Sequence, residues 1–100
     1  MSLTAEEIEQ CRHALGLNES HPEPRETCRN RVYYDETSPF WTMWRNLARR
    51  GYAQYIPAPY RPWSKYALFR VGDRAIPLVI RRGEMMRWAD RAENAHTEYK

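Results

Sequence analysis

The segment from residue 38 to residue 51 constrains the fold most, because its apolar side chains recur at the spacing of one helix face. These side chains are Phe40, Met43, Trp44, Leu47 and Ala48. Ser38-Pro39 predicts the start of the helix, with the serine as N-cap and the proline at the first helical position. Gly51 predicts its end. The segment therefore predicts a helix that packs on a hydrophobic core.

Another helix is predicted near the N-terminus from the signals at its two ends. Thr4, followed by Glu7 three residues later, forms the pattern of a capping box, and Gly16 is typical of a left-handed helix end. The apolar side chains between these signals recur at helical spacing and are Ile8, Cys11 and Leu15. We therefore predict a helix over Ala5–Leu15.

The rest of the chain is predicted to alternate between strands and one last helix. The segments that favour strands by their β-branched and aromatic residues are 29–34, 52–56 and 65–71. Residues 75–80 also favour a strand, which Pro77 would confine to an edge or to the start of a strand. A last helix is predicted over residues 84–95, with an apolar face made of Met85, Trp88, Ala89 and Ala92.

Together these elements predict an α+β fold in a single domain, residues 1–100. An N-terminal helix precedes a central helix, which is followed by a β-hairpin or a three-stranded antiparallel sheet and then by a C-terminal helix. Leu47–Gly51 and the hairpin after it resemble the last part of a winged-helix domain, although a helix-turn-helix needs two closely spaced helices. A polar loop is expected at about residues 18–28 and a frayed tail at about 96–100.

The aromatic residues are expected to build most of the core. They make up 13% of the chain, and each buried aromatic side chain removes a large area from water. The residues predicted to be buried together are Ile8, Leu15, Phe40, Trp44, Leu47, Phe69 and Val71.

Charge is distributed unevenly along the chain. Residues 37–83 carry nine basic and one acidic side chain, whereas residues 1–36 carry eight acidic and four basic. A cationic segment attracts phosphates or acidic protein surfaces, and arginines beside aromatic residues are common where such partners bind. The residues predicted to bind a partner or nucleic acid are Arg29, Arg31, Arg45, Arg49, Arg50, Tyr60, Arg61, Trp63 and Lys65. Alternatively, these charges form a solvated face that pairs with the acidic N-terminal segment. Asn30 is expected to have a structural role.

The sequence lacks the patterns of known catalytic sites. No G-x-S-x-G, P-loop or G-x-G-x-x-G pattern occurs, so we expect no enzymatic activity, no cofactor and no small-molecule substrate. Cys11, His13, His21 and Cys28 lack the paired spacings of a zinc site, so no metal is predicted. We expect the two cysteines to be reduced thiols in a cytoplasmic protein. The chain has no apolar run long enough to cross a membrane, and we expect no secretory signal, because residues 1–10 carry three glutamates and no apolar run.

Two short motifs carry a resemblance to a protein family. Cys11–Leu17 reads Cys-Arg-His-Ala-Leu-Gly-Leu and follows Leu3, Thr4 and Ile8, and Cys28–Arg31 ends in Arg-Asn-Arg. This pattern resembles that of small, uncharacterised proteins encoded by phages and prophages, in which a tyrosine usually stands at the position of Cys28. Residues 46–71 are also similar. The resemblance implies a phage or prophage origin and no particular activity.

Charge and resemblance together lead to one functional hypothesis with two alternatives. We expect an accessory protein, acting in the cytoplasm of a bacterial host, that binds a host or phage protein or a nucleic acid. Inhibition of a host defence complex is one form of this hypothesis. The alternatives are a small winged-helix-like DNA-binding regulator and a structural component of a phage particle.

Overall fold

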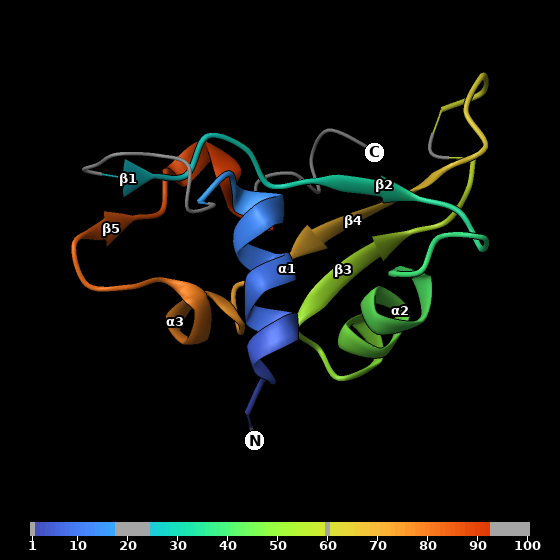
Figure 1. Ribbon diagram of the computed structural model, residues 1–100. Coiled ribbons are helices and arrows are strands. Elements are labelled where there is room, and N and C mark those ends of the chain that lie inside the picture. The colour runs from blue at the N-terminus through green and yellow to red at the C-terminus, as the bar shows by residue number, and fades with distance from the viewer. Residues whose placement is uncertain (1, 18–24, 60, 93–100) are drawn as a thin grey trace.

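The computed structural model describes residues 2–17, 25–59 and 61–92 and has an α+β fold (Figure 1). Its main layer is an antiparallel sheet of the strands β2 (Val32–Tyr34), β4 (Ala67–Val71) and β3 (Ala53–Ile56), in that order. The helices α1 (Ala5–Leu15) and α2 (Trp41–Arg49) pack on one face of this sheet. The predicted fold class, with a helix at each of these positions and strands after the central helix, is confirmed.

Helix α1 has the predicted bounds because the capping interactions predicted at its two ends are both formed. Thr4 Oγ1 accepts the backbone N–H of Glu7 at 3.1 Å, and Glu7 Oε1 accepts the backbone N–H of Thr4 at 2.9 Å. At the other end Gly16 adopts a φ of 80°, which places the Leu17 N–H on the Arg12 carbonyl at 2.8 Å. A side chain at Gly16 would also collide with Cys28 Sγ, so glycine is needed there for two reasons.

Helix α2 begins later than the sequence predicts. Ser38 Oγ accepts the N–H of Phe40 at 3.1 Å and the Ser38 carbonyl accepts the N–H of Trp41 at 3.1 Å, which forms a tight turn before the first α-helical residue. Phe40, and not Ser38, is therefore the N-cap residue of α2. At the other end Arg50 is the C-cap residue, and Gly51, which was predicted as the cap, follows it in the left-handed conformation with a φ of 85°.

The strands of the main sheet lie within the predicted segments. Phe69 on β4 stands opposite Val32 on β2 and Tyr55 on β3, so β4 is the central strand. Its residues Ala67, Phe69 and Val71 belong to the core beneath α1 and α2. Among the described residues a single helix, α2, lies between β2 and β3. The described part of the chain therefore contains no helix-turn-helix, and the winged-helix resemblance extends only to a helix followed by a hairpin.

The last third of the chain differs from the prediction in two places. Residues 75–80, expected as a strand, contain the short helix α3 (Ile76–Val79). Pro77 lies in its first turn, where a proline costs no hydrogen bond, and Ile76 and Val79 are buried three residues apart on one face.

The helix predicted over residues 84–95 is also wrong for residues 84–91. Residues 84–85 form β5 (Glu84–Met85), which pairs in parallel with β1 (Arg25–Glu26), and residues 88–90 form the 3₁₀ turn η1 (Trp88–Asp90). The expected apolar face does not exist, because Met85 and Trp88 are exposed. Strand β1 also lies within the expected polar loop at 18–28. Residues 18–24 of that loop and the tail at 96–100 lie outside the described residues.

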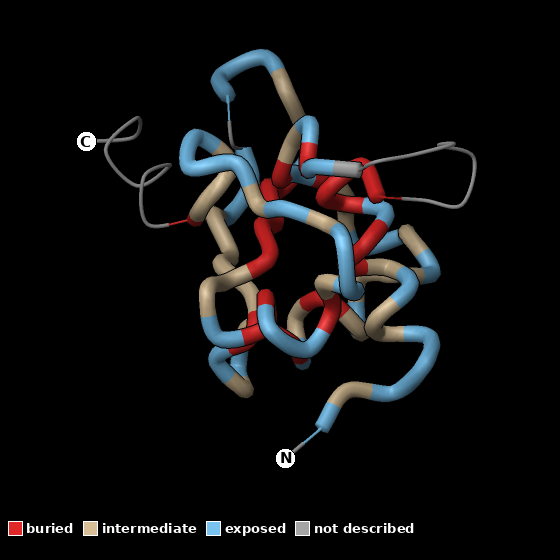
Figure 2. Tube along the Cα trace, turned by 90° about the vertical axis from the view of Figure 1, so that its left-hand side faces the viewer, coloured by how far each residue is buried: buried red, intermediate tan, exposed pale blue. Residues whose placement is uncertain are grey.

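The buried segments gather in the interior of the molecule (Figure 2), and the core residues come mainly from the main sheet and the helices α1, α2 and α3. Leu15, Trp44, Leu47, Phe69 and Val71 are fully buried in one cluster as predicted, while Ile8 and Phe40 are partly buried against it. Phe69 is its centre: the ring centroids of Trp41, Trp44, Tyr55 and Tyr34 lie 5.3–6.4 Å from its own. No helix in the described part of the chain is long and apolar enough to cross a membrane.

The Cys11–Leu17 motif is a packing unit. Its apolar members Cys11, Ala14, Leu15 and Leu17 are fully buried. Arg12 is also buried, and its guanidinium forms two hydrogen bonds of 2.6 Å to the Glu84 carboxylate and one of 2.8 Å to the Val79 carbonyl. The motif therefore ties α1 to α3 and β5, which the sequence gives no means to foresee.

Candidate arginine-lined binding site

The structure separates the predicted binding residues into groups instead of joining them on one surface. Arg45 and Lys65 line one pocket of about 310 Å³, but Asp35 and Glu36 line it as well, so its charges balance. The Arg45 guanidinium lies 4.1 Å from the ring centre of Tyr55, and Lys65 Nζ lies 3.4 Å from Asp35 Oδ2. This pocket is therefore a poor site for an anion.

The two arginines at the end of α2 have different surroundings. Arg50 Nη1 donates to Glu7 Oε2 at 2.8 Å and Arg50 Nη2 donates to the Ser2 carbonyl at 3.0 Å, so Arg50 joins α2 to the start of α1. Burial by itself raises the pKa of Glu7, but hydrogen bonds from Thr4 and Arg50 hold that pKa below its ordinary value. Arg49 is exposed, and its side chain forms no hydrogen bond or ion pair with another described residue.

Arg61 and Trp63 lie in the loop between β3 and β4. The Arg61 guanidinium carbon lies 5.7 Å from the Trp63 ring centre, and Trp63 is 77% exposed. The predicted site residue Tyr60 lies outside the described residues. This loop therefore keeps a cation and an aromatic ring together, with the ring at the surface.

Arg29 and Arg31 lie elsewhere, at a cavity of about 170 Å³ that we call the arginine pocket. The pocket lies between residues 28–31, the end of β4 and η1, and its lining residues are Cys28, Arg29, Asn30, Arg31, Arg70, Arg87, Ala89 and Asp90. Four of these carry a positive charge and one carries a negative charge. Of the residues predicted to bind a partner, the structure brings these two arginines into the most strongly cationic of the three described pockets.

Asn30 holds the pocket together, which confirms its predicted structural role. Its side-chain oxygen accepts the N–H of Val71 at 2.7 Å, and its side-chain nitrogen donates to the Val71 carbonyl at 2.9 Å and to the Asp90 carbonyl at 2.8 Å. The side-chain amide of Asn30 thus continues the hydrogen bonding along β4 past the first residue of β2, Val32. It fixes residues 28–31, β4 and η1 relative to one another.

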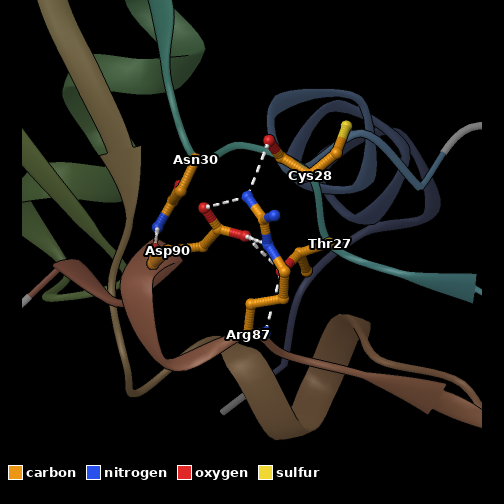
Figure 3. A network of polar contacts seen from close by, with 5 residues as sticks. All are labelled: Thr27, Cys28, Asn30, Arg87 and Asp90. Atoms are coloured by element: carbon orange, nitrogen blue, oxygen red, sulfur yellow. Dashed lines mark hydrogen bonds and ion pairs between the residues drawn. The ribbon is translucent and has the colours of Figure 1, made fainter.

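A second network fixes the side chains of Arg87 and Asp90 (Figure 3). Arg87 Nε donates to Asp90 Oδ2 at 2.8 Å, and the Thr27 hydroxyl donates to the same oxygen at 2.6 Å while accepting the Arg87 N–H at 2.9 Å. Burial by itself raises the pKa of Asp90, but the hydrogen bonds from Arg87 and Thr27 and the nearby charge of Arg31 hold that pKa below its ordinary value. Asp90 is therefore ionised at neutral pH.

The other three arginines differ in how firmly they are held. Arg70 is only 6% exposed and its Nε donates to the Asn30 carbonyl at 3.2 Å. Arg29 Nη2 donates at 2.7 Å to the His13 carbonyl, at the C-terminal end of α1 where a cation is favourable. Arg31 is exposed, and its guanidinium forms no hydrogen bond or ion pair with any residue that the structure describes. The pocket therefore combines fixed donors with one rim arginine that is available to a ligand.

A wider hollow of about 480 Å³ adjoins the arginine pocket and shares two of its arginines. We call it the tyrosine hollow, and its lining residues are His13, Arg29, Arg31, Val32, Tyr33 and Tyr34. Tyr34 packs inward on Phe40 and Phe69, whereas Tyr33 is 40% exposed on the other side of β2. The tyrosine hollow thus offers one accessible aromatic ring beside the shared arginines.

Sequence reasoning missed Arg70 and Arg87 as members of the site. Arg70 alternates with the core residues Phe69 and Val71 and so has the pattern of a solvent-facing strand residue, although the chain covers it. Arg87 falls in the segment that was predicted as a helix. No local signal places either residue beside Arg31, because the pocket is formed by segments about 40 and 60 residues apart.

The thiols and carboxylates of the structure show no arrangement typical of a reactive site. Cys11 and Cys28 are free, and burial, with a smaller effect of the Glu7 charge, raises the pKa of Cys11 to about 12. Within residues 2–17, 25–59 and 61–92, no three side chains of His, Cys, Asp or Glu gather as metal ligands do. His21 and His96 lie outside these ranges. No protein-family model, no curated protein and no solved structure matches the chain.

Proposed function

We propose that this chain is a non-enzymatic binding protein that contacts an anionic macromolecule through the arginine pocket. The observation that carries the proposal is the convergence of Arg29, Arg31, Arg70 and Arg87 on one cavity, whose described lining residues include one carboxylate, Asp90. Like charges held this close repel one another, and an anionic group from a partner relieves that repulsion. Arginine is also the side chain best suited to phosphate and carboxylate groups, because its planar fork donates two parallel hydrogen bonds.

The rigidity of the pocket supports binding as its function. Asn30 and Asp90 hold the surrounding segments by hydrogen bonds of 2.6–3.2 Å, so a partner meets donors that are already in place. Preorganised donors cost less conformational entropy on binding than mobile ones. The exposed pair Arg61 and Trp63 offers a further contact of the kind common at macromolecular interfaces.

A binding role agrees better with these side chains than catalysis does. The buried Cys11 has a pKa of about 12, so its thiol stays protonated and is a poor nucleophile. Asp90 has a lowered pKa and its oxygens are engaged by Arg87 and Thr27, so it is a weak base at neutral pH. We propose no cofactor and no small-molecule substrate.

The setting of this function comes from the resemblance to phage and prophage proteins. This resemblance favours a partner in the cytoplasm of a bacterial host. The partner would be either a nucleic acid or a host or phage protein with an acidic surface. Inhibition of a host defence complex is one form of this hypothesis, in which the arginine pocket contacts an acidic surface of one of its proteins.

The test is affinity capture from a bacterial lysate with immobilised wild-type protein, Arg31→Glu and Arg49→Glu. Both substitutions reverse one exposed positive charge, but only Arg31 lines the arginine pocket. We expect the wild type and Arg49→Glu to retain the same partner and Arg31→Glu to lose it. Retention by all three proteins, or by none, would reject the arginine pocket as the contact site.

A further inference from the structure

We infer that the arginine pocket and the tyrosine hollow together bind single-stranded nucleic acid, with a backbone phosphate in the pocket and a base against Tyr33. This inference rests on the proposed function and names the class of partner. It starts from the fact that Arg29 and Arg31 line both cavities, so a ligand held by these arginines reaches both.

The size and charge of the arginine pocket fit a phosphate group. Its volume of about 170 Å³ lies below the roughly 300–1,000 Å³ of sites for drug-sized ligands, so it suits a small group and not a whole nucleotide. Arg87 donates hydrogen bonds from Nε to Asp90 Oδ2 at 2.8 Å and from Nη2 to Asp90 Oδ1 at 3.2 Å. The Asp90 carboxylate therefore neutralises one of the four positive charges. Arg29 and Arg31 contribute two further positive charges, and both stand where the pocket meets the tyrosine hollow.

The tyrosine hollow fits the base of a nucleotide. Its volume of about 480 Å³ exceeds that of the arginine pocket, and Tyr33, which lines it, is a residue that is 40% exposed. Bases stack on exposed aromatic side chains whatever their sequence, whereas a phosphate or a carboxylate gains nothing from a tyrosine face. Since Tyr34 is turned inward onto Phe40 and Phe69, Tyr33 is the ring of β2 that a base can reach.

The pairing of a phosphate-sized pocket with a stacking ring favours a single strand over a duplex. In a duplex the bases are stacked on one another and cannot lie against a side chain, whereas an unpaired strand exposes its bases next to its phosphates. An acidic protein surface would fill the arginine pocket but would give Tyr33 no ring partner of this kind. We therefore place single-stranded DNA or RNA at this site.

The experiment is a fluorescence-anisotropy titration of the full chain with labelled ten-nucleotide strands of thymidine or uridine, at low and at physiological salt. A labelled duplex and an acidic peptide are the comparison ligands. The variants are Arg31→Ala, Tyr33→Ala and Tyr33→Phe, with Arg49→Ala as the matched control, and circular dichroism checks that each is folded.

We expect the single strands to bind more tightly than the duplex and more weakly as salt rises. Tyr33→Ala should weaken binding on the order of tenfold to a hundredfold, as for the loss of one stacked base, while Tyr33→Phe and Arg49→Ala should bind like the wild type. Equal affinity for the duplex, or full binding by folded Tyr33→Ala, would overturn the inference. So would binding by the acidic peptide alone.

The outcomes also separate this inference from the proposed function. If no strand binds but Arg31 is still needed to capture a protein from the lysate, the nucleic-acid site is wrong and the binding function stands. If neither assay depends on Arg31, both are wrong.

Discussion

Substitution of Asn30 by alanine should destabilise the protein more than any other change of a single polar side chain near the pocket. The substitution removes three hydrogen bonds of 2.7–2.9 Å and leaves the N–H and carbonyl of Val71 and the carbonyl of Asp90 without this partner. Each such bond contributes about 0.5–1.5 kcal/mol net, and more where a buried group is left unsatisfied. We therefore expect the free energy of unfolding to fall by about 2–4 kcal/mol.

The measurement is urea denaturation followed by tryptophan fluorescence. Asn46→Ala is the matched control, because Asn46 is exposed on α2 and its side chain accepts one hydrogen bond from the described residues, from Arg50 Nη1 at 3.1 Å. The control should change the free energy of unfolding by less than about 0.5 kcal/mol. A loss for Asn30→Ala as small as that of the control would refute the view that this amide joins residues 28–31 to β4 and η1.

Four further predictions follow from single residues. Trp44→Ala should cost about 3–5 kcal/mol, visible as a much lower melting temperature, because its fully buried ring packs on Phe69; an unchanged melting temperature would reject the described core. Gly16→Ala should cost more than about 1 kcal/mol in urea denaturation, through its φ of 80° and the collision with Cys28 Sγ, and adding Cys28→Ala should restore part of the loss. A thiol reagent should label only Cys28 in the native protein and both cysteines after unfolding, since Cys11 is buried with a pKa of about 12; rapid double labelling would contradict this. The pKa of Asp90 is lower in the folded protein than its ordinary value of 3.8, so ionised Asp90 stabilises the fold above pH 3.8. This stability is lost as the pH falls through the pKa that Asp90 has in the folded protein. The unfolding free energy of Asp90→Asn should therefore depend less on acid pH than that of the wild type.

The parts of the fold that were predictable depend on local signals. Helix α1 could be given its bounds because Thr4, Glu7 and Gly16 act within one turn of its ends. The core of α2, β3 and β4 could be predicted because the apolar spacing of Phe40–Ala48 and the alternation at Phe69 and Val71 are properties of each segment alone.

The parts that were not predictable depend on distant partners. Residues 84–85 have no strong strand signal of their own and extend because they pair with residues 25–26 and because Glu84 binds the buried Arg12. The short helix α3 formed where β-branched residues favour a strand, since Ile76 and Val79 pack against α1. Tertiary contacts thus overrode local preference in both segments.

The candidate site was predictable in part. The sequence pointed to Arg29 and Arg31 but grouped them with Arg45 and Arg50, whose charges the structure pairs with carboxylates or aromatic rings instead. The convergence of segments at the arginine pocket arises from Asn30, and its three hydrogen bonds reach residues about 40 and 60 positions away. No spacing rule within a segment reports such a contact.

The most direct test of the arginine pocket is a titration of isotope-labelled protein, followed through the Nε–H signals of its arginines by nuclear magnetic resonance. The ligands are a single-stranded thymidine decamer and, separately, an acidic peptide. We predict that whichever ligand binds shifts the signals of Arg29, Arg31 and Arg70 and leaves that of Arg49 in place, because only the first three line the pocket. Shifts confined to Arg45, Arg49 or Arg61, with the signals of the pocket arginines unchanged, would contradict the account.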